Sequence, residues 1–257
     1  MTHANLPETR DPDVTAIIER AVAHHGGWDR WRRLARIELQ LDTLGGPIPW
    51  AKGLGKTWPR PGRVDVMPRR QQVRFIDWPA AGSDVLYDAG RVHIDSADGP
   101  PPDATGCRQA TRSRGALRRW TPMHAAYFFG AALSTYYGVP FILPEAEVLG
   151  RVEHGSGDRR HDVLTVRFPA DFHTHGPVQR FWFAADGCLV RHDYHAGVLG
   201  PGAWGAHFSR DYVTLDGWPL ARTRDVRLGV GWFPRVAASP MPVLQARLTP
   251  LAVHFEG

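Results

Sequence analysis

The sequence predicts a mostly β protein of the α+β class: an antiparallel half-barrel, that is, an incomplete β-barrel, closed by an N-terminal helix and a central buried helix. Segments with a period of two recur along the 257 residues and are separated by glycine and proline. An amphipathic helix precedes these strands, and a helix that is apolar on nearly all sides divides them. Because the apolar face of an antiparallel sheet must be covered, we expect the central helix to lie against it.

The N-terminal helix is expected from about Asp13 to His25, where apolar residues recur at helical spacing and Gly26-Gly27 supplies a C-terminal stop. A short basic turn, Trp28 to Leu34, follows. From Arg36 the period changes to two, which predicts a half-buried strand. Four further runs resemble strands: Arg63–Pro68, Gln71–Trp78, Asp84–Tyr87 and Arg91–Asp95.

The central helix begins at Thr121-Pro122, an N-cap followed by proline in the first helical position, and continues to about Tyr137. After Pro140–Pro144 the strands resume and continue to Phe255, with a loop near Ser239–Pro242. No internal repeat or low-complexity linker divides the sequence. We therefore expect a single domain over residues 1–257, in which residues 1–12 are flexible.

Composition narrows the classes of partner. The formal net charge is only +5 although the pI is 9.6, and nearly all the positive charge is arginine. No nucleic-acid-binding motif is present, so we expect no nucleic-acid partner.

The ten tryptophans suit a cavity wall and helix–sheet packing equally. One dense basic cluster is interpreted as a solvated loop, with an anion clamp as the alternative: Arg108, Arg112, Arg114, Arg118 and Arg119.

The segment Met1–Arg10 lacks the basic and apolar regions of a signal peptide. The longest apolar stretch, Pro122–Leu143, contains glycine, proline and a histidine, and is predicted to be a buried helix rather than a membrane span. The two cysteines, Cys107 and Cys188, provide neither a disulfide framework nor metal-ligand spacing. We expect a reduced, cytoplasmic protein without stable membrane insertion, and the sequence leaves its oligomeric state open.

The order of elements resembles the LolA/LolB-like lipoprotein-carrier superfamily. Its members are incomplete β-barrels closed by helices around a hydrophobic cavity, so the resemblance implies a hydrophobic ligand. Local patterns are more similar to a group of uncharacterised cytoplasmic bacterial proteins, with no activity that could be transferred. The stretches that match are His24-His25-Gly26-Gly27, Thr174-His175, Gln179 to Phe183, Arg191-His192-Asp193-Tyr194 and Ala206-His207-Phe208.

Histidines gather in the segment His161–Leu228, and its turns assign them to faces of the sheet. A two-residue type I′ turn at Asp186-Gly187 would pair Ala185 with Cys188. The opposite face would carry an Arg180–Asp193 ion pair on a wetter surface. Three pairs would then share the apolar face: Phe183–Val190, Phe181–His192 and Gln179–Tyr194.

His192 and Tyr194 are therefore predicted to point into the apolar interior, with His175 and His207 within reach. A buried imidazole beside a phenol and an amide is a plausible general acid or base, and these four residues are the candidate catalytic group. The alternative is a structural cluster satisfied by its own hydrogen bonds. His-x-His spacing also permits a divalent metal on His173, His175 and His207. No metal-binding motif accompanies this spacing. We therefore expect no cofactor, and a bound metal is the alternative.

A second turn, at Asp216-Gly217, places His207, Ser209 and Asp211 on one face. Asp211 would face Arg222, partly buried, as either a structural clasp or an element that recognises an anion. The sequence contains neither a phosphate-binding loop nor the Gly-x-Ser-x-Gly motif of serine hydrolases.

These observations predict a protein that binds a hydrophobic or aromatic small molecule, lipid-like or polyketide-like, in the cavity of the half-barrel. The alternative is an enzyme, a cyclase, isomerase or lyase, in which the histidines and Tyr194 catalyse acid–base chemistry on such a molecule, with or without a metal. The candidate ligand-binding residues are Gln179, Phe181, Phe183, Tyr127, Phe128, Tyr136, Asp211 and Arg222.

Overall fold

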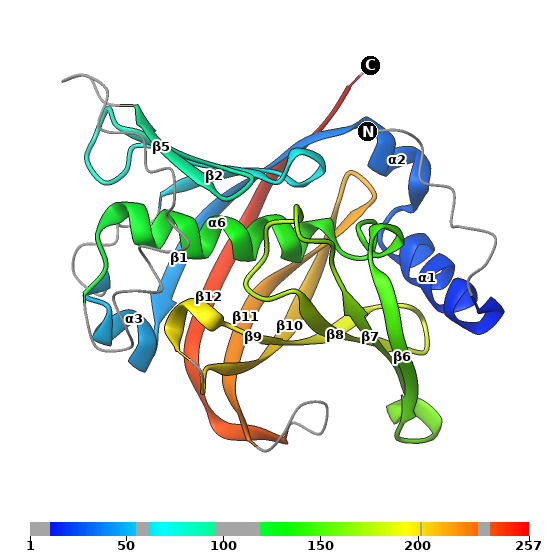
Figure 1. Cartoon of the computed structure of the whole chain (residues 1–257). Helices are drawn as coiled ribbons and strands as arrows, with labels where there is room; N and C mark the ends of the chain where they lie inside the picture. Colours follow the sequence, from blue (N-terminus) through cyan, green and yellow to red (C-terminus); the bar gives the residue numbers. More distant parts are fainter. Residues whose placement is uncertain (1–10, 55–61, 96–118, 201, 231–236, 257) are drawn as a thin grey trace.

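The computed structural model describes residues 11–54, 62–95, 119–200, 202–230 and 237–256, and within them it contains one twelve-stranded antiparallel sheet (Figure 1). The strand order is β5-β4-β3-β2-β1-β12-β11-β10-β9-β8-β7-β6, so β5 and β6 are the two edges and the sheet is not closed into a barrel. The prediction of a mostly β half-barrel with an N-terminal and a central helix is confirmed.

The strands of one half of the sheet are β1 Leu34–Gly45, β2 Arg63–Met67, β3 Gln72–Phe75, β4 Asp84–Asp88 and β5 Arg91–Asp95. Those of the other half are β6 Glu147–His154, β7 His161–Arg167, β8 Val178–Ala184, β9 Leu189–His195, β10 Trp204–Leu215, β11 Trp218–Val230 and β12 Ala237–Phe255. The described α-helices are α1 Pro12–His24, α2 Gly27–Arg33, α3 Pro47–Ala51 and α6 Pro122–Gly138.

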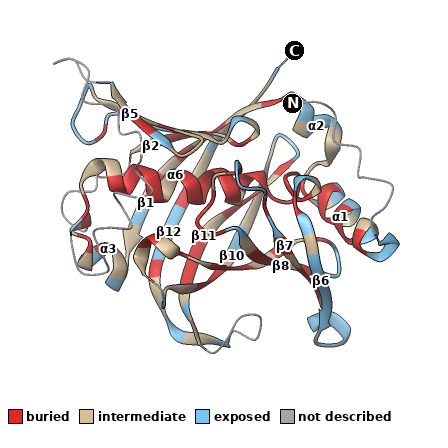
Figure 2. Ribbon diagram, viewed as in Figure 1, coloured by how far each residue is buried: buried red, intermediate tan, exposed pale blue. Residues whose placement is uncertain are grey.

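The chain enters the sheet at its centre and reaches one edge through β2 to β5. Helix α6 then crosses the inner side of the sheet, as Figure 1 shows, and the chain resumes at the opposite edge with β6. Strands β6 to β12 return to the centre, where Val253 of β12 pairs with Ile37 of β1. This path leaves α6 covered on nearly all sides, which Figure 2 shows as a mostly buried ribbon.

Helix α1 is amphipathic and packs near the β6 edge. Asp11 caps it by accepting a hydrogen bond from the Asp13 backbone, and Arg20 pairs with Asp162 of β7. Helix α2 is held by aromatic contacts, because Trp31 stacks on Phe141 with ring centroids 4.6 Å apart. The apolar stripe of α1 that faces the core is Val14, Ile17, Ile18, Ala21 and Val22.

The sequence missed α3, whose start Gly46-Pro47 resembles ordinary turn punctuation. The loop predicted near Ser239–Pro242 is wrong, because these residues belong to β12. The pairing of β11 with β12 is irregular there, and Arg227 donates to the carbonyls of Ser239 and Pro240, so the proline is tolerated. The arginine cluster lies outside the described residues, Arg119 excepted, as do residues 1–10 of the predicted flexible start.

The turn at Asp186-Gly187 also differs from its prediction. Ala184 donates its N–H to the Cys188 carbonyl, so the loop has three residues, and Gly187 adopts φ 90°. A bulge then pairs Phe183 with Leu189 instead of Val190. The bulge restores the predicted register beyond it: Phe181 lies opposite His192 and Gln179 opposite Tyr194.

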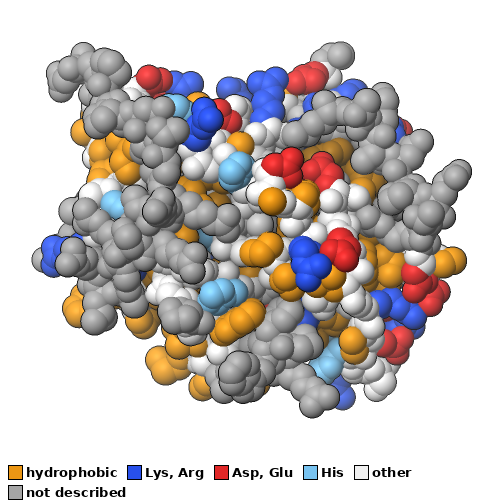
Figure 3. Space-filling model, viewed as in Figure 1, with side chains coloured by type: hydrophobic (Ala, Val, Ile, Leu, Met, Phe, Trp, Pro, Cys, Tyr) orange, Lys and Arg blue, Asp and Glu red, His pale blue; other side chains and the backbone are white. Residues whose placement is uncertain are grey.

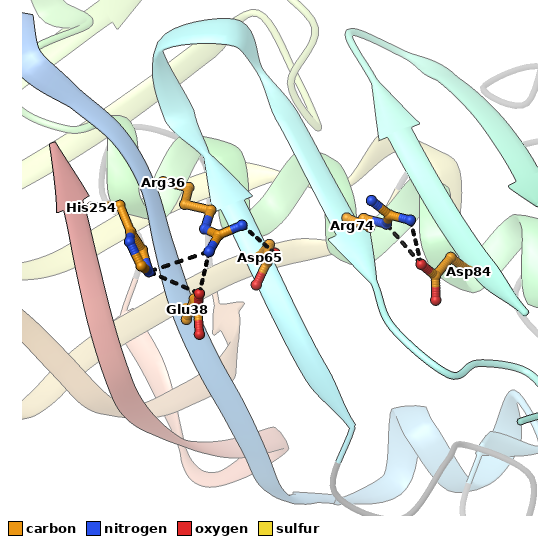
Figure 4. A network of polar contacts seen from close by, with 6 residues as sticks. All are labelled: Arg36, Glu38, Asp65, Arg74, Asp84 and His254. Carbon is orange, nitrogen blue, oxygen red and sulfur yellow. Dashed lines mark hydrogen bonds and ion pairs between the residues drawn. The ribbon is translucent and has the colours of Figure 1, made fainter. Parts of the chain in front are cut away.

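The outer face of the sheet carries charged side chains. Figure 4 shows Arg36 between Glu38 and Asp65, with His254 of β12 in contact with Glu38 at 2.8 Å and Arg74 paired with Asp84. On the face seen in Figure 3, basic and acidic side chains are interspersed among hydrophobic ones. Within the described residues, no helix is both long and apolar enough to cross a membrane.

Gly130 allows α6 to approach the sheet, and a Gly130→Ala variant tests this. An added Cβ would lie 2.3 Å from Cγ of Tyr87, which is fully buried in β4. Overpacking of this kind costs about 1–3 kcal/mol, so we expect a net loss of stability although alanine favours the helix. Urea unfolding of the wild type and the variant measures this loss of stability. Gly45→Ala, where a Cβ meets nothing within 4 Å, is the control, and equal stabilities would contradict the close approach.

Candidate functional site

An apolar cavity lies between α6 and the inner face of β9 to β12. Its volume is about 60 Å³, and the empty space among its lining side chains, including the part that opens to solvent, is about 690 Å³. The helix contributes Phe128, Phe129, Ala132, Leu133 and Tyr136. The sheet and its connections contribute Tyr194, Ala196, Leu199, Ala203, Trp204, Gly205, Arg224, Val226, Arg227, Leu228, Val243, Leu244, Ala246 and Leu248, and α3 adds Ile48.

The structure places only some of the predicted ligand-binding residues at this cavity. Phe128 and Tyr136 line it, whereas Tyr127 points toward β4 and makes an edge contact with Tyr87 at 6.1 Å. Phe181 and Phe183 are fully buried in β8, away from the cavity wall. Among the described tryptophans, Trp204 alone lines the cavity, so most of the indoles serve packing.

Beside the cavity lies a buried group of rings and an amide, here called the histidine–tyrosine cluster: Tyr136, His175, Gln179, His192, Tyr194 and His207. Tyr136 and Tyr194 form the boundary between the cavity and the cluster, because both line the cavity and their hydroxyls are 3.0 Å apart. The histidines lie behind these two rings. The predicted proximity of His192, Tyr194, His175 and His207 is therefore observed, while their chemical role stays a prediction.

Gln179 organises the cluster. Its amide nitrogen donates to Thr174 Oγ1 at 2.5 Å and to the Gly176 carbonyl at 2.8 Å. Its amide oxygen therefore faces His192, and Nε2 of His192 donates to that oxygen over 2.6 Å. This arrangement assigns His192 to the Nε2–H tautomer, with its ring stacked on Phe181 at 4.5 Å.

The other two histidines are held by ring contacts. His207 stacks on Tyr136 with centroids 4.0 Å apart, and neither of its ring nitrogens bonds to a described protein group. His175 is stacked between Phe128, at 4.4 Å, and Tyr194, at 5.2 Å. Both imidazoles thus present polar atoms within an aromatic environment.

Burial keeps four members of the cluster, His192, His207, Tyr136 and Tyr194, uncharged near neutral pH. It lowers the pKa of His192 and His207 well below the usual value, and the positive charge of Arg224 adds to this effect. Burial raises the pKa of Tyr136 to about 12 and that of Tyr194 well above its usual value. The imidazoles of His192 and His207 are therefore neutral bases near pH 7, and the phenols of Tyr136 and Tyr194 are neutral acids.

Arg224 and Arg227 are the charged residues among those that line the cavity, and of the two Arg224 is the buried one. It comes from β11, opposite Ser209 of β10, and donates from Nη1 to the Ser209 hydroxyl at 2.7 Å. Its guanidinium lies over the rings of Tyr136 and Tyr137, at 5.3 and 5.0 Å. Sequence analysis did not assign Arg224 to the site, because an arginine on a predicted strand resembles any other outward-facing charge.

Two predicted polar pairs lie elsewhere. Arg222 donates to both carboxylate oxygens of Asp211 at 2.9 Å, but Asp211 is exposed to solvent and the pair lies outside the cavity, contrary to the expected partial burial. The positive φ of Asp211, 57°, interrupts the alternation of β10 and turns the pair outward. Conversely, Arg180 and Asp193, expected on a wetter surface, are buried beside Arg191 and Trp182.

The predicted metal set is not brought together. His173 lies against Gly90 in the turn between β4 and β5, while His175 packs beneath α6. Within the described residues, no group of three histidine, cysteine or carboxylate side chains is placed to hold a metal ion. Sequence analysis also missed the contribution of β12, although Leu244, Ala246 and Leu248 alternate in a pattern that indicates one inward face.

No protein-family model and no curated protein matches the sequence. Solved structures do match the fold. A LolA superfamily protein from Nitrosomonas europaea aligns over 95% of this chain and 93% of its own, with a TM-score of 0.52 and 10% sequence identity. The chain has a LolA-like fold. A DUF1329 family protein from Desulfovibrio piger aligns over 96% of this LolA-like chain and 94% of its own, with a TM-score of 0.52 and 13% identity.

At such low identities these LolA-like structures support the fold alone. They support the predicted element order, in which a helix crosses the inner side of an open antiparallel sheet. The cavity and the histidine–tyrosine cluster are features of this LolA-like chain that must be interpreted from its own residues.

Proposed function

We propose that this protein binds a hydrophobic or aromatic small molecule in the cavity between α6 and β9 to β12. The observation that carries the proposal is the lining itself, which is almost entirely aliphatic and aromatic and has a few polar groups at one side. Ligand sites commonly combine a mostly apolar wall with a few orienting polar groups. The LolA-like fold, with a helix across an open sheet, supports the same function.

The electrostatics of the cluster favour binding over acid–base catalysis. A general acid or base is most effective when its pKa lies near the working pH. Burial instead moves the pKa of His192 downward and that of Tyr194 upward, away from 7. Tyr136 and Tyr194 also separate the histidines from the cavity, so a bound molecule meets the phenol rings first.

A neutral fluorescent probe, N-phenyl-1-naphthylamine, tests the proposal. We expect it to bind the wild-type protein and to bind an Ala246→Phe variant at least about tenfold more weakly, a loss of about 1.4 kcal/mol. Ala246 lines the cavity from β12, so the larger ring occupies the space of the probe. Fluorescence titration gives both dissociation constants.

The matched control is Ala252→Phe in the same strand. Ala252 pairs with Glu38, whose side chain Figure 4 shows on the outer face, and directly opposed residues of paired strands share a face. This variant is expected to bind the probe as the wild type does. If both variants bind it equally well, or if the wild type does not bind it, the cavity is not the binding site.

A further inference from the structure

Arg224 is a buried cation without a carboxylate partner in the described part of the chain. Its residue is only 4% exposed, and no described aspartate or glutamate forms an ion pair with it. Two other arginines differ: Arg191 of β9 pairs with Asp193, and Arg222 of β11 pairs with Asp211. Burial of an unpaired ion costs several kcal/mol, so a missing counter-ion at this position needs an explanation.

The guanidinium keeps donors available. Nη1 bonds to the Ser209 hydroxyl, whereas Nε has no hydrogen-bond partner among the described residues. A guanidinium has five N–H groups in a fixed plane, which match a carboxylate or phosphate. The rings of Tyr136 and Tyr137 hold the group in place through cation–π contacts but accept none of these hydrogen bonds in conventional geometry.

The titratable neighbours of Arg224 do not compensate its charge. His25, His192 and His207 have lowered pKa values because they are buried, and the pKa values of Tyr136 and Tyr212 are raised for the same reason. All five are uncharged near pH 7. None of these five groups therefore neutralises the charge of Arg224, which lies in an environment of low polarity where a charge-assisted hydrogen bond is strong.

The guanidinium of Arg224 lies at the wall of the apolar cavity. Arg224 and Tyr136 line the cavity together with aliphatic residues of β11 and β12, among them Val226 and Leu244. Arg227 also borders the cavity, but it is only partly buried, and its guanidinium lies over Phe208 and donates to the Ser239 and Pro240 carbonyls. An apolar wall that holds a buried cation without a described carboxylate partner is complementary to an apolar chain that ends in an anion.

We infer that the ligand is a single-chain amphiphile with an anionic head group, and that Arg224 is the residue that binds this head group. The inference rests on the proposed function, because it assigns a chemical class to the molecule that occupies the same cavity. The head group would replace the absent carboxylate partner, and Ser209 would fix the guanidinium beside it. A carboxylate and a phosphate both fulfil this requirement.

Displacement of N-phenyl-1-naphthylamine by three ligands of equal chain length tests the inference: dodecanoate, dodecyl phosphate and 1-dodecanol. The titrations are run below micelle formation at about pH 8, where the carboxylate is ionised and the histidines are neutral. We expect the wild type to bind at least one anionic ligand about tenfold or more tightly than dodecanol. The two anionic arms show whether carboxylate or phosphate is preferred.

An Arg224→Met variant should lose this preference, with affinity for dodecanol unchanged within about twofold. Arg222→Met, which removes an arginine of the same strand outside the cavity, should keep it. If Arg224→Met does not fold, two other measurements test the role of Arg224: the ligand preference of an Arg224→Lys variant, and the effect of each ligand on the melting temperature of the wild type. Lysine should keep a reduced preference, and the anionic ligand should raise the wild-type melting temperature more than dodecanol does.

The results separate the two proposals. If the wild type binds all three ligands with equal affinity, the cavity binds apolar chains and the role of Arg224 is wrong. If Arg224→Met keeps the anionic preference, the head group binds elsewhere and the inference is likewise overturned. If neither the probe nor any of the three ligands binds the wild type, the proposed function itself fails.

Discussion

Lowering the pH from about 7 to about 5.5 is expected to reduce the free energy of unfolding by about 3–4 kcal/mol. The cause is three buried histidines, His25, His192 and His207. Burial lowers the pKa of His25 to about 4 and those of the other two well below the usual value. Each should contribute about 1 kcal/mol over this interval.

The sign follows from proton binding. In the unfolded chain these histidines titrate near pH 6.5, whereas the folded protein keeps them neutral. Below that pH the unfolded state binds more protons, so stability falls as the pH falls, and for His25 the loss continues to about pH 4. Above pH 6.5 these histidines are neutral in both states, so they change the free energy of unfolding little. The buried Asp65 and Asp193 have raised pKa values, so their protonation stabilises the folded protein at lower pH and opposes the effect of the histidines. For this reason the stabilities are compared only down to about pH 5.5.

Urea unfolding at several pH values measures this dependence. In a His207→Phe variant, the slope of the unfolding free energy against pH should fall by about one third, because one of the three buried histidines is removed. Stability above pH 7 should be retained, because a phenyl ring can stack on Tyr136 and His207 makes no hydrogen bond to a described group. Exposed His154 supplies the control, His154→Gln, which should keep the full slope. A wild-type stability that is flat between pH 7 and 5.5 would show that the histidines are hydrated or paired.

Much of the fold follows from local signals. Period-two alternation and Asp-Gly turns were sufficient to place His192 opposite Phe181 and Tyr194 opposite Gln179. The alternation also compensated for an error in the turn: the loop has one residue more than predicted, and a bulge at Val190 returns the side chains to their expected faces. Burial of one face thus determines the register more strongly than the turn type does.

The site was less predictable because it depends on contacts between distant elements. Asp211 was expected near the interior, but its positive φ turns it to solvent, and an aspartate in a strand gives no sequence signal for this conformation. Arg224 became a candidate only when the surrounding carboxylates could be located and none proved to be its partner. The cavity wall from β12 begins at Val243, which lies 36 residues in sequence after His207 and 51 after His192, beyond the reach of a hairpin argument.

A Gln179→Leu variant is expected to lose about 4 kcal/mol of stability, the largest effect of any single substitution considered. Gln179 is fully buried and makes three hydrogen bonds, to His192, Thr174 and Gly176. Leucine fills a similar volume but leaves the His192 N–H and the Gly176 carbonyl without this partner. Each unsatisfied buried group costs about 1–3 kcal/mol.

Gln179 does not line the cavity, so the variant separates structure from binding. Below its melting temperature, Gln179→Leu should bind N-phenyl-1-naphthylamine within about twofold of the wild type, since the loss concerns the fold and not the wall of the site. Gln245→Leu is the control, because Gln245 is exposed and makes one hydrogen bond, to Asp225; its cost should stay within about 1 kcal/mol. A loss below about 1 kcal/mol for Gln179→Leu would mean that water or a rearranged His192 replaces the amide. Such a result would reopen the alternative in which the cluster is a reactive centre and not a fixed support for Tyr194.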